Sequence, residues 1–116
     1  MSEYGPAIFC KRKDGEPLTS GEQERLLKQV KKACSELKIV DNMDRAPAAP
    51  REYDYDGYEA NAVSFVLWSD CAFGVAPEPV QEDFHQDAKD LSERIGAHIE
   101  RGAPKTYAFD GYYVEV

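Results

Sequence analysis

Apolar residues recur with the period of an α-helix in two long stretches of the chain. In the first stretch, residues spaced four, three and four apart form one stripe: Leu26, Val30, Ala33 and Leu37. Just before the stripe, Thr19 and Glu22, or Ser20 and Gln23, have the spacing of a capping box, in which side chains satisfy the first backbone N–H groups of a helix. The pattern predicts a helix that starts within residues 18–23 and continues to Leu37.

The second stretch is equally regular. Its apolar residues are spaced four, four, three, four and four apart: Val80, Phe84, Ala88, Leu91, Ile95 and Ile99. Glycine commonly ends a helix, as Gly102 would here, and Pro104 after it cannot continue one. We therefore expect a second helix over residues 80–101, with one apolar side that packs against other elements.

Short apolar or alternating segments lie around the two predicted helices and are typical of β-strands. They cover residues 7–10, 53–58, 60–68 and 105–116. The segment 60–68 is apolar on both faces, which predicts either a central strand covered on both sides or an interface. Asp56-Gly57 favours a tight hairpin turn, and Asp110-Gly111 leaves open whether the last segment is one strand or a hairpin.

The predicted elements follow the order strand, helix, strand, strand, helix, strand. This is the split βαβ order of ferredoxin-like domains. We therefore expect an α+β fold: a ferredoxin-like βαββαβ two-layer sandwich, with an antiparallel sheet and two helices on one face. Because 116 residues is close to the commonest domain size, we expect residues 1–116 to form a single α+β domain.

The composition narrows the functional classes. The chain is 42% hydrophobic and 31% charged, which is typical of a folded domain, and its longest apolar run has only four residues. Residues 1–40 contain eight Lys/Arg and six Asp/Glu, a balance of +2. Residues 41–116 contain six Lys/Arg and sixteen Asp/Glu, a balance of −10, so the net charge of the chain is −8. Such a charge repels nucleic acid and anionic membranes, and it attracts a basic protein surface. The simpler interpretation is that the charge keeps the domain soluble.

The cysteines are three in number, widely spaced and without a C-x-x-C pair: Cys10, Cys34 and Cys71. This pattern argues against a disulfide framework and favours a reducing compartment, so we expect the protein to be cytoplasmic. No motif indicates a catalytic residue, a metal site or a cofactor. Glu52, Asp54 and Asp56 resemble the start of a calcium loop, but Val63 stands where the bidentate Glu would be required.

The strongest candidate for a binding surface is the acidic, tyrosine-rich segment after residue 50. Tyrosines and aspartates alternate in it, so they would point to opposite faces of a strand. If the tyrosine face is not part of the core, it forms an aromatic contact surface with an acidic rim. The candidate partner-binding residues are Tyr53, Asp54, Tyr55, Asp56, Tyr58 and Glu59.

A second candidate is a pocket between the sheet and the helices, lined by Trp68, Cys71 and His98. His98 lies on the apolar stripe of the second helix, where a histidine is usually a residue at the edge of the core, bonded to a backbone carbonyl. His85 is expected to be a solvated residue on the flank of the same helix. Because His85 and His98 are 13 residues apart and about 140° apart around the axis, they cannot share a metal.

The leading hypothesis is a non-enzymatic, acidic protein-binding domain of the inhibitor or immunity-protein kind, which docks on a basic surface of another protein. The alternative is a small-molecule-binding protein or small enzyme with a pocket between sheet and helices. A homodimer is left open. Fold analogy alone cannot decide between these functions.

Overall fold

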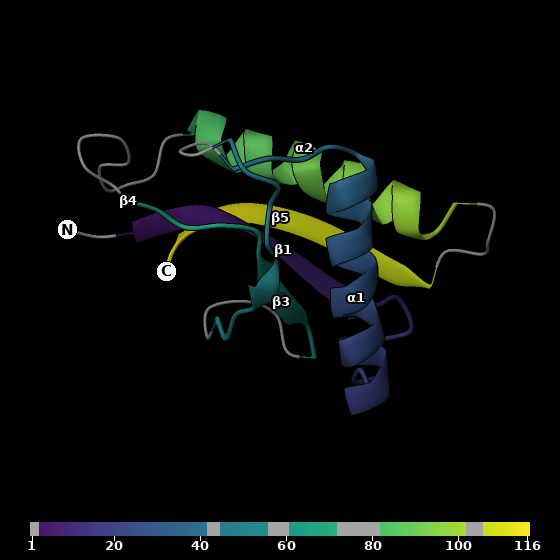
Figure 1. The fold of residues 1–116 in the computed structure, drawn as a ribbon. Coiled ribbons are helices and arrows are strands. Elements are labelled where there is room, and N and C mark those ends of the chain that lie inside the picture. The colour runs from purple at the N-terminus through teal and green to yellow at the C-terminus, as the bar shows by residue number, and fades with distance from the viewer. Residues whose placement is uncertain (1–2, 42–44, 56–60, 72–81, 102–105) are drawn as a thin grey trace.

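The computed structural model describes residues 3–41, 45–55, 61–71, 82–101 and 106–116 (Figure 1). In chain order its elements are β1 (Glu3–Arg12), α1 (Ser20–Glu36), β2 (Arg51–Glu52), β3 (Val63–Val66), β4 (Asp70–Cys71), α2 (Glu82–Ile99) and β5 (Tyr107–Glu115). The predicted α+β class is confirmed.

All described strand pairs are antiparallel, and β1 lies inside the sheet. On one side β1 pairs with β5 over nine residues, with Ala7 opposite Tyr112. On its other side β3 pairs with residues 7–10 of β1 and β4 pairs with residues 3–4. The strand β2 extends the sheet beyond β3. Because β3 and β4 lie end to end along β1, the sheet is four strands wide.

Both helices pack on one face of the sheet (Figure 1). Ile8 and Cys10 of β1 point to this face and join a buried cluster that includes Leu26 and Val30 of α1 and Ile95 of α2. Burial of these side chains, each of which is about 1% exposed or less, is the main source of folding free energy. The arrangement is compatible with a two-layer sandwich.

The predicted start of the first helix is confirmed. Thr19 is the N-cap: its hydroxyl accepts a hydrogen bond from the Glu22 N–H (3.1 Å), and the Glu22 carboxylate accepts one from the Thr19 N–H (3.2 Å). At the other end, Lys38 has a φ of 57° and the Ile39 N–H bonds to the Cys34 carbonyl. This is a Schellman-type helix end with lysine where glycine is usual.

The helix α2 has a buried face that differs from the predicted stripe. Its buried residues are all small or aliphatic: Ala88, Ser92, Ile95 and Gly96. Gly96 leaves room for the ring of Phe109, since a Cβ there would lie 2.6 Å from that ring. The helix therefore lies very close to β5, and Leu91 and Ile99 are only partly buried. The predicted first residue, Val80, lies outside the described residues.

The last strand, Tyr107–Glu115, is continuous, so of the two possibilities that the sequence left open the structure has a single strand and no hairpin at Asp110-Gly111. A Cβ on Gly111 would lie 2.2 Å from the Ala88 carbonyl oxygen, so this glycine permits a close helix–strand contact. The turn predicted at Asp56-Gly57 lies outside the described residues. Residues 53–55, which the sequence assigned to the strand before that turn, follow β2 and are not part of a strand.

Candidate functional site

Tyr53 and Tyr55 lie over the sheet face that the helices leave uncovered. Their rings stack with centroids 6.2 Å apart, and Tyr55 meets Phe9 edge-on at 5.6 Å. Phe9 is 1% exposed and belongs to a second buried cluster on this face, together with Ala7 and Val114. The tyrosines thus cover part of an aromatic core on the side opposite the helices.

Hydrogen bonds fix the position of Tyr53. Its backbone N–H donates to the Ser64 carbonyl at 2.9 Å, and its carbonyl accepts a hydrogen bond from the Ser64 hydroxyl. The Tyr53 hydroxyl donates to the backbone carbonyl of Glu115 at the end of β5. Burial, followed by the nearby Tyr55, raises the pKa of Tyr53 and keeps the phenol protonated as a donor.

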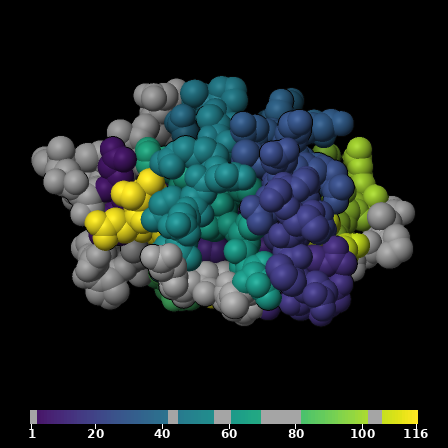
Figure 2. All heavy atoms as spheres, turned by 90° about the horizontal axis from the view of Figure 1, so that it is seen from below, coloured from purple at the N-terminus to yellow at the C-terminus, as the bar shows by residue number. Residues whose placement is uncertain are grey.

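Tyr55 is the part of this region that faces solvent. Its side chain is 40% exposed, and Val40 is the only other large hydrophobic residue as exposed within the described part of the chain. Glu52 and Asp54 beside it are exposed, and neither carboxylate has a bonding partner among the described residues. Figure 2 shows the segment around residues 45–55 across the middle of one side of the molecule, between α1 and the C-terminal end.

We call Glu52, Tyr53, Asp54 and Tyr55 the tyrosine surface. A depression of about 420 Å³ adjoins it, lined also by Gln23, Ala62, Val63 and Ser64. Of the six predicted partner-binding residues, the structure brings Tyr53, Asp54 and Tyr55 together. Asp56, Tyr58 and Glu59 lie outside the described residues.

A separate groove of about 390 Å³ lies on the helix side and contains Trp68. We call it the Trp68 groove. Besides Trp68, which lies between β3 and β4, its lining residues come from β1, from α2, from β5 and from the segment that follows α1: Pro6, Lys38, Ile39, Val40, Phe84, Asp87, Asp90, Leu91, Arg94 and Tyr113. The rings of Phe84 and Tyr113 stack with centroids 5.2 Å apart. Sequence reasoning identified only Trp68, because the other lining residues come from four distant segments.

His98 does not line the Trp68 groove. Its Nε2 atom lies 2.9 Å from a carboxylate oxygen of Glu36, so it joins the second helix to the end of the first. The expected backbone carbonyl partner is therefore replaced by a carboxylate, and this bond lowers the pKa of Glu36. His85 is also bonded: its Nδ1 accepts the Tyr113 N–H at 3.2 Å. The side chain of Cys71 lies outside the described part of the structure.

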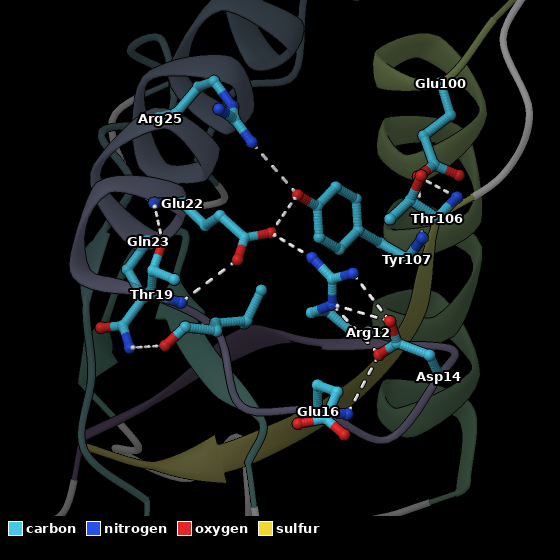
Figure 3. Close-up of polar contacts among 11 residues, drawn as sticks. Arg12, Asp14, Glu16, Thr19, Glu22, Gln23, Arg25, Glu100, Thr106 and Tyr107 are labelled. Atoms are coloured by element: carbon cyan, nitrogen blue, oxygen red, sulfur yellow. Dashed lines mark hydrogen bonds and ion pairs between the residues drawn. The ribbon is translucent and has the colours of Figure 1, made fainter.

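A polar cluster that the sequence did not predict connects α1 to β1 and β5 (Figure 3). A carboxylate oxygen of Glu22 accepts hydrogen bonds from the Tyr107 hydroxyl (2.7 Å) and from Arg12 (3.0 Å). Arg25 donates to the same hydroxyl at 3.2 Å, and Arg12 also pairs with Asp14 at 2.7 Å.

The groups in this cluster satisfy one another. The hydrogen bond from Tyr107, with smaller contributions from the Thr19 N–H and Arg12, lowers the pKa of Glu22. Arg12, followed by the Glu16 N–H, lowers the pKa of Asp14 to about 2. Both carboxylates are therefore ionised and paired at neutral pH, which is the condition of structural residues rather than of a general acid or base. The only local sign of the cluster was the capping box, since Tyr107 is 85 residues away from Glu22.

Side chains also occupy the outer edge of β5. Three backbone N–H groups that point away from β1 each have a side-chain acceptor: Tyr107 bonds to Glu100 (2.8 Å), Gly111 to Asp110 (2.8 Å) and Tyr113 to His85 (3.2 Å). Lys89 of α2 holds the Asp110 carboxylate at 3.0 Å. The helix α2 therefore covers this edge with polar side chains as well as with its apolar face.

Within the residues that the structure describes, no three His, Cys, Asp or Glu side chains are grouped as metal ligands. In the same residues, no helix has the length and apolar character required to cross a membrane. Comparisons of the chain with protein-family models, curated proteins and solved structures found no match.

Proposed function

We propose that this chain is a non-enzymatic protein-binding domain that docks on a basic surface of another protein through the tyrosine surface. Inhibitors and immunity proteins are the functional kind that we favour. The observation that carries the proposal is the exposed ring of Tyr55, which Tyr53 and Phe9 hold in place. Beside it lie the exposed carboxylates of Glu52 and Asp54, which have no bonding partner within the part of the chain that the structure describes.

The energetics of protein interfaces support this choice. Tyrosine is enriched among the residues that contribute most to binding, because its large ring loses little conformational entropy. Here the ring contacts and the hydrogen bonds of Tyr53 fix that geometry before any partner binds, which lowers the cost of association. The neighbouring carboxylates and the net charge of −8 would accelerate encounter with a basic partner.

The thiols support the non-enzymatic part of the proposal. Burial, with smaller contributions from Glu100 and Glu22, raises the pKa of Cys10 to about 12, and burial raises the pKa of Cys34 to about 11. A thiol that stays protonated at neutral pH is a poor nucleophile. Both thiols are free, which supports a reducing compartment such as the cytoplasm.

For the fold class we propose the ferredoxin-like arrangement. If β3 and β4 are the two halves of one bent strand, the chain order becomes βαββαβ and the strand order across the sheet becomes β2, β3/β4, β1, β5. The antiparallel pairing of each neighbouring pair supports this assignment. The fold class carries no argument about the partner.

The test is affinity capture from lysate at low salt with three forms of the protein. The first is the wild type, and the second carries Asp54→Lys and Tyr55→Ala. The third carries Glu24→Lys, which makes the same charge change on the exposed side of α1. A basic protein retained by the wild type and by Glu24→Lys, but lost by the double variant, is the expected result.

The kinetics of the purified pair sharpen the test. Asp54→Lys alone should lower the association rate and weaken its dependence on salt, because an exposed rim charge acts mainly on encounter. Tyr55→Ala alone should raise the dissociation rate. The proposal fails if no protein is captured, or if the double variant binds the captured protein as well as the wild type does.

A further inference from the structure

The Trp68 groove combines an apolar floor with charged groups at both ends. Trp68, Phe84 and Tyr113 supply aromatic surface, and Leu91 lies in the middle of the α2 wall. The volume of about 390 Å³ is within the range of small-ligand sites. The groove lies on the helix side of the sheet, so it is separate from the tyrosine surface, and a ligand could bind it whether or not that surface has a partner.

Opposite charges lie at the two ends of the groove. Arg94 donates a hydrogen bond to the Leu37 carbonyl at 3.4 Å, so its guanidinium lies next to Lys38 and forms a basic end with it. Asp87 precedes Arg94 by seven residues on α2 and, one turn from Phe84, which also lines the groove, it forms the acidic end. Neither the carboxylate of Asp87 nor the ammonium group of Lys38 has a bonding partner among the described residues.

The separation of these ends indicates the size of a matching ligand. Seven residues of helix correspond to about 10 Å along the axis of α2. A fully extended peptide advances about 3.3–3.6 Å per residue, so about three residues span this distance. Free termini would supply an ammonium group for Asp87 and a carboxylate for Lys38 and Arg94, while an apolar middle side chain would contact Leu91 and Trp68.

We propose that the Trp68 groove binds a short zwitterionic peptide of about three residues. Its amino terminus lies at Asp87, its carboxylate at Lys38 and Arg94, and its apolar side chain on the aromatic floor. Charge complementarity at both ends selects this class, because a ligand with a single charge leaves one end of the groove uncompensated. Asp90, between the two ends, accepts a hydrogen bond from Gln86 and offers further oxygen acceptors to peptide N–H groups.

The residue Lys38 provides a variant that keeps the fold. It adopts the left-handed conformation at the end of α1, with a φ of 57°, where glycine is the most favourable residue. Lys38→Gly therefore removes the cation from the groove without straining the backbone. Asp87→Asn removes the negative charge at the other end and preserves the shape of the side chain.

The experiment uses the only tryptophan of the chain, Trp68, as the reporter. The probe is the tripeptide Ala-Leu-Ala with free termini, and its N-acetylated and C-amidated forms are the comparison ligands. We expect a saturable change in Trp68 fluorescence with half-saturation in the millimolar range or below, and calorimetry should report the same affinity. Blocking either terminus should weaken binding about tenfold, the usual effect of losing a hydrogen-bonded charge.

The variants test the orientation of the peptide. Asp87→Asn should weaken the free peptide about tenfold and leave the acetylated peptide unaffected, because that ligand has already lost the same contact. Likewise, Lys38→Gly should weaken the free peptide about tenfold and leave the amidated peptide unaffected, because the amidated peptide has already lost its contact with Lys38. Asp83→Asn and Lys28→Ala are charge-matched controls outside the groove and should bind like the wild type.

Three results would overturn the proposal: no saturable signal by either method up to about 10 mM peptide, equal affinity for blocked and free peptides, or variants of the groove that bind like the controls. The double variant of the tyrosine surface should bind the peptide normally. Failure of the peptide test is therefore distinguishable from failure of the proposed function.

Discussion

Gly111→Ala is the change whose effect can be worked out most directly from the structure. The added Cβ would lie 2.2 Å from the Ala88 carbonyl oxygen and 2.6 Å from its carbon atom. Real Cβ atoms essentially never approach a non-bonded heavy atom closer than 3.0 Å, so α2 and β5 must separate by about 1 Å locally. The backbone of a helix cannot yield as the end of a side chain can, so the strain spreads into the core around Ala88.

Overpacking of this kind lowers the free energy of unfolding by about 1–3 kcal/mol. Because the neighbour is the rigid backbone of α2 at Ala88, we expect Gly111→Ala to lie at the upper end of this range. For 116 residues the entropy of unfolding at the midpoint is about 0.24 kcal/mol per kelvin, so 3 kcal/mol lowers the Tm by about 12 °C. Circular dichroism during thermal and urea unfolding measures this change. The urea m-value should stay constant if only the native state is affected.

Two further glycine variants distinguish a close helix–strand approach at Gly111 from a turn conformation or a general effect of alanine. Gly21→Ala lies in the first turn of α1, where the nearest atom is the Thr19 hydroxyl at 4.0 Å, so it should leave stability unchanged or raise it by up to about 1 kcal/mol. If Gly111 were a turn residue, Gly111→Asn would be milder than Gly111→Ala. The close approach predicts that asparagine is at least as harmful. A Gly111→Ala protein within about 0.5 kcal/mol of the wild type would refute the reasoning.

Three other predictions concern the polar cluster and the thiols. The carboxylate of Glu22 has a lowered pKa, so its contribution to stability is complete above its ordinary value of 4.5 and is lost as the pH falls through the lowered value. Tyr107→Phe removes the largest cause of that shift, and urea unfolding should show a smaller loss of stability between pH 6 and pH 3 than in the wild type; an unchanged loss would contradict the assignment. Thr19→Ala should cost about 1 kcal/mol in the same assay, since it removes the N-cap of α1, and a cost near zero would show that the cap is dispensable. Cys10 and Cys34 should react with a thiol reagent at pH 8 only after denaturation, because burial keeps both thiols protonated; peptide mapping by mass spectrometry after labelling of the native protein would reveal any exception.

The features that the sequence predicted correctly depend on nearby residues. The start of α1 needs only Thr19 and Glu22, which satisfy each other across one turn. The class of the fold follows from the alternation of helical and extended periods. The apolar stripe predicted the buried face of α2 less well, because the close packing of Gly96 against Phe109 shifts that face toward Ser92. The shift depends on contact with β5, which begins more than ten residues after Gly96, so the sequence of α2 alone does not predict it.

Asp-Gly steps show the limit of local reasoning. The same two residues favour a tight turn when considered alone, yet Asp110 and Gly111 lie within a strand, where Lys89 binds the carboxylate and the Ala88 carbonyl fills the space that a side chain would need. Only the position of α2 distinguishes the two roles.

The candidate sites divide in a similar way. Alternation drew attention to Tyr53, Asp54 and Tyr55, but it did not identify Phe9 as the ring beneath them, because Phe9 lies in β1. The Trp68 groove was accessible to sequence reasoning through one residue only. Its charged ends come from a helix and from a segment 49 positions earlier, and no pattern in the chain links Lys38 with Asp87.

The side chains on the outer edge of β5 have a consequence for self-association. An exposed strand edge normally templates pairing with another chain, and so it promotes both sheet-extending dimers and fibrils. In this domain a second strand could add to β5 only after displacing Glu100, Asp110 and His85 from the backbone N–H groups that they occupy. Among the described strands, the opposite edge of the sheet is the two-residue β2. Continuous β-sheets that run from one copy to the next are therefore disfavoured while α2 is folded, and local opening of this helix would be the step that exposes the chain to aggregation.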